Sequence, residues 1–170
     1  EHAPEGAKIG FDAWLHGEQW VKAIGAQLKP KGAKLVAVAA NPIDAVWDDR
    51  PVPSEAPLKV MSETAAGRSS ANKRAEIADW LKSKSLDAVV VSALDSIAWL
   101  FNIRGSDVSR TPVALSFALL HADGTAELFV DDEKLTAEVR AHLGNAVSTA
   151  PRAAFVTRLD GLAGKTIAID

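Results

Sequence analysis

Two apolar runs with a polar loop between them constrain the fold more than any other part of the chain. Ala88–Val91 is typical of a buried strand, and Val113–Leu120 of a second one. Asp95 and Ser96 favour helix N-caps, so a short apolar helical turn is expected after the first strand. The loop Asn102–Asp107 that follows carries an amide, a guanidinium, a carboxylate and a glycine. A polar loop between two buried strands is held by a rigid frame, as many binding loops are.

Helix signals stand on both sides of this region. Ser70 is a good N-cap for a helix with apolar residues at helical spacing on one face, namely Ile77, Trp80 and Leu81. Thr136 is expected to begin a second helix, which ends at Gly144. We expect Trp80 to belong to the core.

The remaining elements complete an α/β pattern. His121–Gly124 ends in Asp-Gly between two apolar runs, which predicts a β-hairpin. A short strand, a helix near residues 154–162 and a last strand within Gly164–Asp170 follow. The order of elements predicts a mixed β-sheet with flanking helices, preceded by a partial βαβ unit.

That βαβ unit occupies the first part of the chain. Lys8–Asp12 predicts a strand, and Asp12 is expected to cap a helix with apolar positions at Trp20, Val21, Ile24 and Leu28. Leu35–Ala39 predicts the second strand. A unit of this size cannot bury both faces of a sheet, so it needs partner strands. We expect Trp20 to pack in a core, and no internal repeat or low-complexity tract is evident.

Prolines divide the chain. Pro51–Pro57 holds three prolines in seven residues, which excludes a helix or a central strand. We therefore expect residues 1–50 to be the C-terminal part of a first domain, 51–69 a linker, and 70–170 a second domain that is truncated at its C-terminus.

Composition excludes several classes of protein. Net charge is −3 and no basic stripe is present, which argues against a nucleic-acid partner. Cysteine is absent, so disulfides and thiolate metal sites are excluded. No apolar run approaches the roughly 20 residues of a membrane span, and Glu1–Gly6 lacks a signal-peptide core.

Catalytic motifs are also missing. No two histidines have the spacing of the His-Glu-x-x-His zinc motif, and no Gly-x-Ser-x-Gly sequence occurs. The acidic groups Asp48-Asp49 and Asp131-Asp132-Glu133 are interpreted as solvated turn residues, because adjacent carboxylates rarely converge on one ion. His121 is expected on the surface, and His142 near a helix C-terminus.

Two motifs resemble the three-domain aminopeptidase P family, metal-dependent enzymes that remove an N-terminal residue preceding proline. The first motif comprises Asp95, Ile97–Asn102, Arg104–Asp107 and Pro112, and it lies in the family's middle, creatinase-like domain. The second is Asn41–Pro51, which is similar to the end of the family's first domain. Arg110 departs from the pattern, since His or Tyr is expected there.

The resemblance implies that the chain is an internal fragment of a longer enzyme. Its catalytic domain would lie beyond residue 170 and hold two divalent metal ions, manganese or zinc, with two Asp, one His and two Glu. No catalytic or metal-binding residue is therefore assigned in this chain. The implied partners are that catalytic domain, a second subunit in a homodimer and a peptide with proline in second position, in a cytoplasmic setting.

Two interpretations of the polar loop remain open. Arg104 and Asp107 either form a local salt bridge that stiffens a turn, or the loop faces the catalytic domain and lines the substrate cleft. For the second, a guanidinium fork suits a peptide carboxylate or a catalytic-domain acid. The candidate residues at a substrate cleft or domain interface are Trp99, Asn102, Arg104, Asp107 and Arg110.

Two other functions are kept as alternatives. One is a stand-alone creatinase-like binding module without enzymatic activity. The other is part of a related prolidase- or creatinase-type hydrolase, although a domain preceding the linker argues against it.

Overall fold

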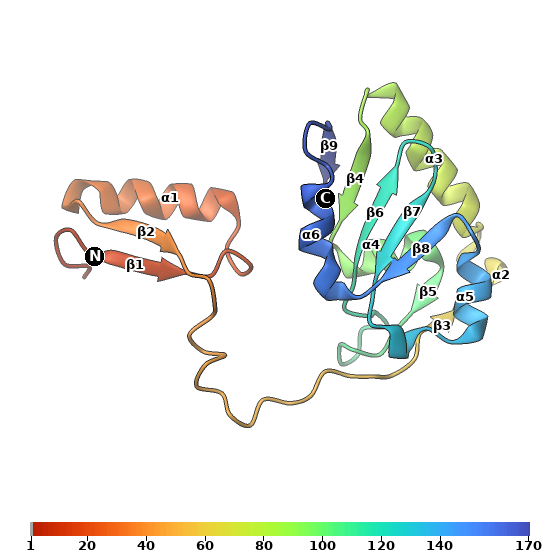
Figure 1. Cartoon of the computed structure of the whole chain (residues 1–170), viewed down its shortest axis with the longest axis horizontal. Coiled ribbons are helices and arrows are strands. Elements are labelled where there is room, and N and C mark those ends of the chain that lie inside the picture. The colour runs from red at the N-terminus through yellow and green to blue at the C-terminus, as the bar shows by residue number, and fades with distance from the viewer. Residues whose placement is uncertain (1) are drawn as a thin grey trace. The chain divides into compact units, whose positions relative to one another are not determined.

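A computed structural model describes residues 2–170 of the chain. The chain divides into two compact units, Glu1–Val52 (unit 1) and Pro53–Asp170 (unit 2), which are labelled by their elements in Figure 1.

Unit 2 is built on a five-stranded mixed sheet. Its order is β8 (Val147–Ala150), β7 (Ala126–Phe129), β6 (Phe117–His121), β4 (Ala88–Val91) and β9 (Ile167–Ile169). The outer pairs β7–β8 and β4–β9 are parallel, whereas β4–β6 and β6–β7 are antiparallel. The predicted mixed sheet and the hairpin at Asp123-Gly124 are confirmed.

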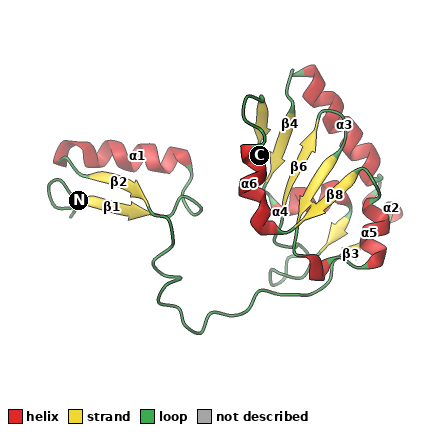
Figure 2. Cartoon of the chain, viewed as in Figure 1, coloured by secondary structure: helices red, strands yellow, loops and turns green. Residues whose placement is uncertain are grey.

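Helices cover this sheet, as Figure 2 shows. They are α3 (Ser70–Ser83), α4 (Leu94–Phe101), α5 (Ala137–Leu143) and α6 (Phe155–Asp160). The unit also contains the short helix α2 (Glu63–Ala66), which has no buried residue, and the 3₁₀ turns η2 (Asp132–Lys134) and η3 (Arg152–Ala154). A small antiparallel pair, β3 (Lys59–Val60) and β5 (Ile103–Arg104), lies beside them.

The strand alternation divides the core into two layers. Val89 and Val91 face the layer that contains Leu81 of α3, Phe101 of α4 and Val139 of α5. Val90 faces the opposite layer, in which Phe129 packs against Phe155 of α6. Phe155 also stacks on Phe117 with ring centroids 4.2 Å apart. The first layer is the larger one, and α4 with the polar loop belongs to it.

Thr136 caps α5 as expected, and Gly144 ends it. The Thr136 hydroxyl accepts a hydrogen bond from Val139 N at 3.2 Å. Thr136→Ala should lower the free energy of unfolding of unit 2 by about 1 kcal/mol, because an amide at the helix start loses its partner. A urea midpoint unchanged from the parent chain would contradict this role.

Other helix starts differ from the sequence prediction. Ser69 caps α3 in place of Ser70, since its hydroxyl accepts from Asn72 N. Asp95 and Ser96 lie inside α4, whose N-cap is Ala93. The carboxylate of Asp170 accepts the backbone amides of Ser92 and Ala93 instead, each at 2.9 Å.

The second apolar run is shorter as a strand than predicted. β6 begins only at Phe117, and Val113 and Ala114 are buried in the preceding loop. Trp80 was predicted in the core but is 44% exposed, because Leu81 and Ala78 hold the buried stripe of α3.

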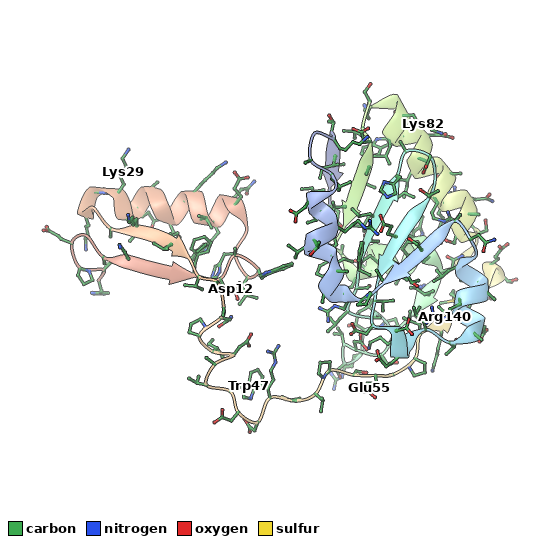
Figure 3. The ribbon with its side chains drawn as sticks, in the orientation of Figure 1. Asp12, Lys29, Trp47, Glu55, Lys82 and Arg140 are labelled. Carbon is green, nitrogen blue, oxygen red and sulfur yellow. The ribbon has the colours of Figure 1, made fainter. Side chains whose placement is uncertain are left out.

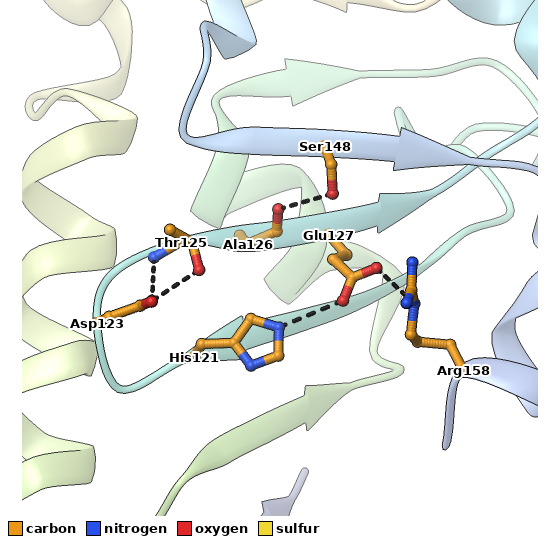
Figure 4. Close-up of polar contacts among 7 residues, drawn as sticks. All are labelled: His121, Asp123, Thr125, Ala126, Glu127, Ser148 and Arg158. Atoms are coloured by element: carbon orange, nitrogen blue, oxygen red, sulfur yellow. Dashed lines mark hydrogen bonds and ion pairs between the residues drawn. The ribbon is translucent and has the colours of Figure 1, made fainter. Parts of the chain in front are cut away.

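His121 is not simply a surface residue. Its Nε2 lies 3.3 Å from Oε1 of Glu127, and Arg158 of α6 reaches Oε2 of the same carboxylate at 2.8 Å (Figure 4). The Glu127 side chain is only 15% exposed. This bridge fastens α6 to the second face of the sheet, while Asp123 binds Thr125 within the hairpin turn.

Unit 1 is a small parallel βαβ element. It comprises β1 (Lys8–Phe11), α1 (Glu18–Leu28), the turn η1 (Lys29–Lys31) and β2 (Lys34–Ala37). Helix α1 has no buried residue, and Trp20 is 42% exposed rather than in a core. Among its described residues, Ala33 alone is a buried apolar side chain. Gly17, not Asp12, is the N-cap of α1.

The segment predicted as a linker is partly folded. Leu58 is 3% exposed, and residues 59–66 contribute β3 and α2 to unit 2. Leu58 N donates to Lys134 O at 2.9 Å, and the Lys134 ammonium donates to Ser54 O. Extended, unpacked backbone is thus confined to the first residues of that segment.

No helix among residues 2–170 has the length and apolarity needed to cross a membrane.

Candidate functional site

Helix α4 and strand β5 place the motif residues. Ile97, Leu100 and Phe101 are buried, whereas the Trp99 side chain is 45% exposed on the outer side of the same helix. Helical periodicity explains the split, because the buried residues share one stripe. Trp99 is therefore available for contact with another molecule or domain.

Asn102 ends the helix in a left-handed conformation, with φ of 51°. It is 1% exposed, and its Nδ2 donates to Arg68 O at 2.8 Å. Asparagine tolerates this region better than most residues because its short amide bonds locally. Asn102 thus sets the direction in which β5 leaves the helix, and it does not face solvent.

Lys73 of α3 holds this helix end in place. Its ammonium donates to Asn102 Oδ1 at 2.6 Å and to Trp99 O at 2.9 Å, and it lies 4.5 Å from the Trp99 ring centroid. Lys73 is 1% exposed and forms no ion pair with any residue from 2 to 170. Burial lowers the pKa of the Lys73 ammonium, and the positive charges of Arg104 and Arg68 lower it further.

Arg104 is oriented by carbonyl oxygens. Its Nη1 donates to Ile103 O at 2.8 Å and to Ala98 O at 3.1 Å. No carboxylate among residues 2–170 pairs with it. Within the described part of the chain, the other nitrogens of this partly exposed guanidinium therefore have no acidic partner. The guanidinium lies close enough to Lys73 for the two positive charges to repel each other.

Gly105 allows the loop to fold back on itself. Its amide donates to Pro112 O, and a Cβ at this position would lie 2.6 Å from Ala114 N and 2.7 Å from Ala114 Cβ. Two backbone segments approach here too closely for any side chain.

Gly105→Ala should destabilise unit 2 by roughly 1–3 kcal/mol, because the added methyl forces the backbone of the loop apart. Urea unfolding measures it, and Ser106→Ala at the exposed neighbouring position is the control. Equal midpoints for the two variants would contradict the close approach.

Asp107 does not pair with Arg104, so the local salt bridge considered from the sequence is wrong. Its Oδ1 lies 2.6 Å from Nζ of Lys134, and its Oδ2 accepts Leu115 N at 2.8 Å. The two charged side chains are 2% and 1% exposed. Burial raises the pKa of the Asp107 carboxyl, but hydrogen bonds from Lys134 and Leu115 outweigh it, so this pKa lies below its ordinary value.

These directions predict acid sensitivity. The pKa values of Asp107, Asp123 and Asp170 are all lowered in the folded chain from 3.8. The unfolded chain therefore takes up protons first as the pH falls, and stability that is complete above pH 3.8 is lost progressively below it. Urea midpoints recorded across this range should fall with pH, and less steeply for Asp123→Asn. Midpoints that rise on acidification would contradict the assignment.

Arg110 lies at the tip of the loop. Thr111 N donates to Val108 O at 3.1 Å, closing a tight turn in which Arg110 has φ of 63°. A left-handed conformation at a residue other than glycine is uncommon, and such residues cluster at functional sites. Arg110 is exposed, as a contact residue requires.

The structure thus separates the five candidates. Trp99, Arg104 and Arg110 present their side chains at least partly to solvent, whereas Asn102 and Asp107 fix the backbone from within. Sequence reasoning missed Lys73 and Lys134. Lys73 stands four residues before Ile77 and eight before Leu81, on the buried stripe of its helix, and this spacing was the available signal.

No three His, Cys, Asp or Glu side chains among residues 2–170 gather in a way that would hold a metal ion. One residue of the acidic groups noted in the sequence is engaged elsewhere, since Asp132 pairs with Arg140 at 2.6 Å. The two metal ions implied by the resemblance do not fit residues of this part of the chain.

Comparisons with known proteins agree with the fold and the motifs. The model of the Creatinase/Prolidase N-terminal domain family matches residues 49–170. A "Probable Xaa-Pro aminopeptidase P" of Aspergillus flavus is 42% identical over 152 residues, which are 89% of this chain and 23% of that protein. A protein of the same name from Penicillium rubens is 38% identical over 98% of this chain and 27% of its own length.

A solved structure extends the likeness to three dimensions. The X-prolyl aminopeptidase of Caenorhabditis elegans, described as a cytosolic enzyme with a di-nuclear active site, superposes with a TM-score of 0.88 and 31% identity. The match covers 95% of this chain and 26% of that enzyme, so the chain spans about a quarter of the relatives it resembles. The chain belongs to the creatinase/prolidase N-terminal domain family and is a region of an Xaa-Pro aminopeptidase-like protein.

Proposed function

We propose that this chain is a non-catalytic region of a metal-dependent Xaa-Pro aminopeptidase and that its Arg104 loop shapes substrate access to the active site. Support comes from the names of the relatives and from the share of their length that the chain covers. Hydrolysis and the two divalent metal ions would belong to the remaining polypeptide.

One observation carries the role of the loop. Arg104 is fixed by two backbone carbonyls yet has no acidic partner among residues 2–170, and one of these carbonyls belongs to Ala98, the residue before the half-exposed Trp99. A guanidinium held in this way pays little entropy on binding a carboxylate. The partner would be the carboxylate of a short peptide or an acidic side chain of the catalytic domain.

Trp99 adds an exposed aromatic ring to the Arg104 loop, and the buried Lys73 supports that ring from beneath. The ammonium of Lys73 lies over the indole ring, so it stabilises the ring's orientation from within the unit. An exposed aromatic ring on α4 and a guanidinium on β5, which follows it, suit a peptide that offers side chains and a terminal carboxylate.

Arg104→Ala in the complete enzyme tests this function. A charge-assisted hydrogen bond is worth about 1.5–3 kcal/mol, so kcat/KM for an Xaa-Pro peptide should fall roughly 10- to 150-fold. Arg104→Lys keeps the charge without the fork and should recover only part of the loss.

The matched control is Arg140→Ala, on the exposed surface of α5 (Figure 3). Its kinetics should equal those of the parent enzyme. Unchanged kinetics for Arg104→Ala, with an unchanged urea midpoint, would reject the proposed role of the loop.

Three finer features belong to the same proposal: manganese or zinc as the metal, a homodimer, and a cytoplasmic setting. Activity of the complete enzyme after chelation and metal add-back tests the identity of the metal, and light scattering tests the homodimer. The names of the relatives favour an aminopeptidase over a creatinase-type hydrolase or a module without activity.

A further inference from the structure

Unit 1 has a hollow beyond the carboxyl ends of its two parallel strands. The turn at residues 12–16 follows β1, and the turn at residues 41–43 comes after β2. Between them lies a cavity of about 390 Å³ whose wall includes Phe11, Asp12, Leu15, His16, Val38 and Ile43. This volume is within the range of pockets that hold small ligands. In parallel α/β sheets, ligands bind at this end of the strands.

Most of the wall of this hollow is apolar. Val38 fills the place next to Gly10, since a Cβ on Gly10 would lie 2.9 Å from Val38 Cγ1. Leu15 and Ile43 also line the hollow and are 68% and 62% exposed. Apolar side chains that are this exposed are stabilised by contact with an apolar ligand, because both surfaces leave water.

Asp12 supplies a carboxylate to the wall. Its Oδ1 accepts Trp14 N at 2.8 Å and its Oδ2 accepts Asn41 Nδ2 at 3.0 Å, so it is fixed to both turns at the end of β1 (Figure 3). The side chain is half-buried, and no cationic side chain among residues 2–170 forms an ion pair with it. A carboxylate offers about four acceptor sites, so Asp12 has capacity for further donors.

His16 adds a second acceptor. Its Nδ1 lies 2.8 Å from Asp12 O, and a carbonyl oxygen can only accept, so Nδ1 carries a hydrogen. In the neutral ring, Nε2 is therefore an acceptor. The ring also contacts Phe11 and Trp20, with centroid distances of 6.1 Å and 4.1 Å. These contacts hold the imidazole in one orientation.

Two acceptors on an apolar wall define the chemistry of a ligand. A half-buried carboxylate without a cation favours a positively charged donor. A metal ion does not suit the hollow, because no three His, Cys, Asp or Glu side chains in the described part of the chain could hold one. A protonated amine needs only acceptors, since it carries three hydrogen-bond donors of its own.

We propose that this hollow binds a protonated primary amine attached to an apolar group. Asp12 and His16 accept hydrogen bonds from the ammonium, and Leu15 and Ile43 contact the apolar group. Free amines and the amino terminus of a peptide with an apolar first residue share this chemistry. The site belongs to unit 1 and does not depend on the proposed role of the Arg104 loop.

Nuclear magnetic resonance of the 170-residue chain with ¹⁵N-labelled tryptophan tests the proposal, because the Trp14 amide donates to Asp12. Phenethylamine should shift the Trp14 amide signal to saturation with a Kd of about 1 mM, as expected for a ligand of this size. The alcohol 2-phenylethanol carries the same apolar group without the charge and should bind at least about tenfold more weakly. Equal affinities for the two, or no saturable shift, would overturn the proposal.

Three variants assign the contacts. Asp12→Asn should weaken phenethylamine binding roughly tenfold or more and leave that of 2-phenylethanol unchanged. Leu15→Ala, at an exposed position, should weaken both ligands. Glu18→Gln removes an equal charge from the exposed side of α1 and should change neither. If Glu18→Gln and Asp12→Asn weaken phenethylamine equally, the attraction is general and the assignment to Asp12 is wrong.

The complete gene product and a second probe finish the test. The same saturable shift of the Trp14 amide in the complete protein supports the site. A shift in the 170-residue chain alone means that other residues of the polypeptide fill the hollow, and it overturns the proposal. Leucinamide binding the 170-residue chain more tightly than phenethylamine identifies a peptide amino terminus as the ligand, whereas the opposite order identifies a free amine.

Discussion

Replacing Lys134 by alanine is expected to lower the free energy of unfolding of unit 2 by about 3–5 kcal/mol. The substitution leaves the Asp107 carboxylate buried without its cation, and it removes the donor to Ser54 O. Loss of one partner from a buried pair costs more than the pair itself contributes, because the remaining charge stays out of water. Urea unfolding of the 170-residue chain, followed by the fluorescence of Trp80 and Trp99, measures the loss.

Two variants show whether the buried charge is the cause. Lys82→Ala disrupts a contact in which both side chains are more than half exposed, and it should change stability by less than about 1 kcal/mol. The double variant Lys134→Met, Asp107→Leu removes both charges and should recover much of the loss. A loss for Lys134→Ala no larger than that for Lys82→Ala would contradict the buried pair.

Phe101→Ala is expected to cost about 3–5 kcal/mol of unfolding free energy. Phe101 is fully buried in the larger core layer, at the last residue of α4. Its removal leaves a cavity beneath the turn at Asn102, and the backbone carbonyl that accepts His142 Nε2 at 2.8 Å sits at the same place. The position of the Arg104 loop therefore depends on this ring.

Trp99→Ala is the matched control from the same helix. Its side chain is 45% exposed, so its loss should lower stability much less than the loss of Phe101. In the complete enzyme we expect Trp99→Ala to raise KM for an Xaa-Pro peptide more than changes to exposed residues elsewhere in unit 2 do. Equal losses of stability for the two variants would contradict the division of α4 into a buried and a contact face.

Local signals predicted much of unit 2. The apolar run Ala88–Val91, the Asp-Gly turn and the Thr136–Gly144 helix each satisfy a short-range rule, and all three are confirmed. Such rules depend on residues within one turn or one hairpin. The mixed sheet followed from their order, because connections of these lengths permit few arrangements.

Features that depend on distant residues were not predictable in this way. The N-terminus of α4 is capped by Asp170, 77 residues away from Ala93. Lys134 bonds to Asp107, 27 positions earlier, so of the two interpretations of the loop the one that paired Asp107 with Arg104 is wrong. Trp80 was expected in the core because it lies among the apolar positions of its helix, but α3 buries the neighbouring Leu81 and leaves Trp80 44% exposed.

The candidate residues illustrate the same limit. Sequence identified Trp99, Asn102, Arg104, Asp107 and Arg110 as one group, because they are close along the chain. The structure assigns two of them to the interior, where they fix the loop. A residue that shapes the loop differs from one that can contact another molecule in its solvent exposure and its hydrogen-bond partners. A linear motif contains neither kind of information.

The hydrogen bond from Lys134 to Ser54 O has a practical consequence for cutting the protein into pieces. Residues 53–58 belong energetically to the second unit, since Ser54 supplies an acceptor to a buried ammonium and Leu58 bonds to Lys134 O. A fragment that starts at the first regular element, Lys59, would discard both and expose the Asp107–Lys134 pair to water. Proteolytic trimming of the intact chain should accordingly stop before Ser54, and the shortest piece that folds well should begin there.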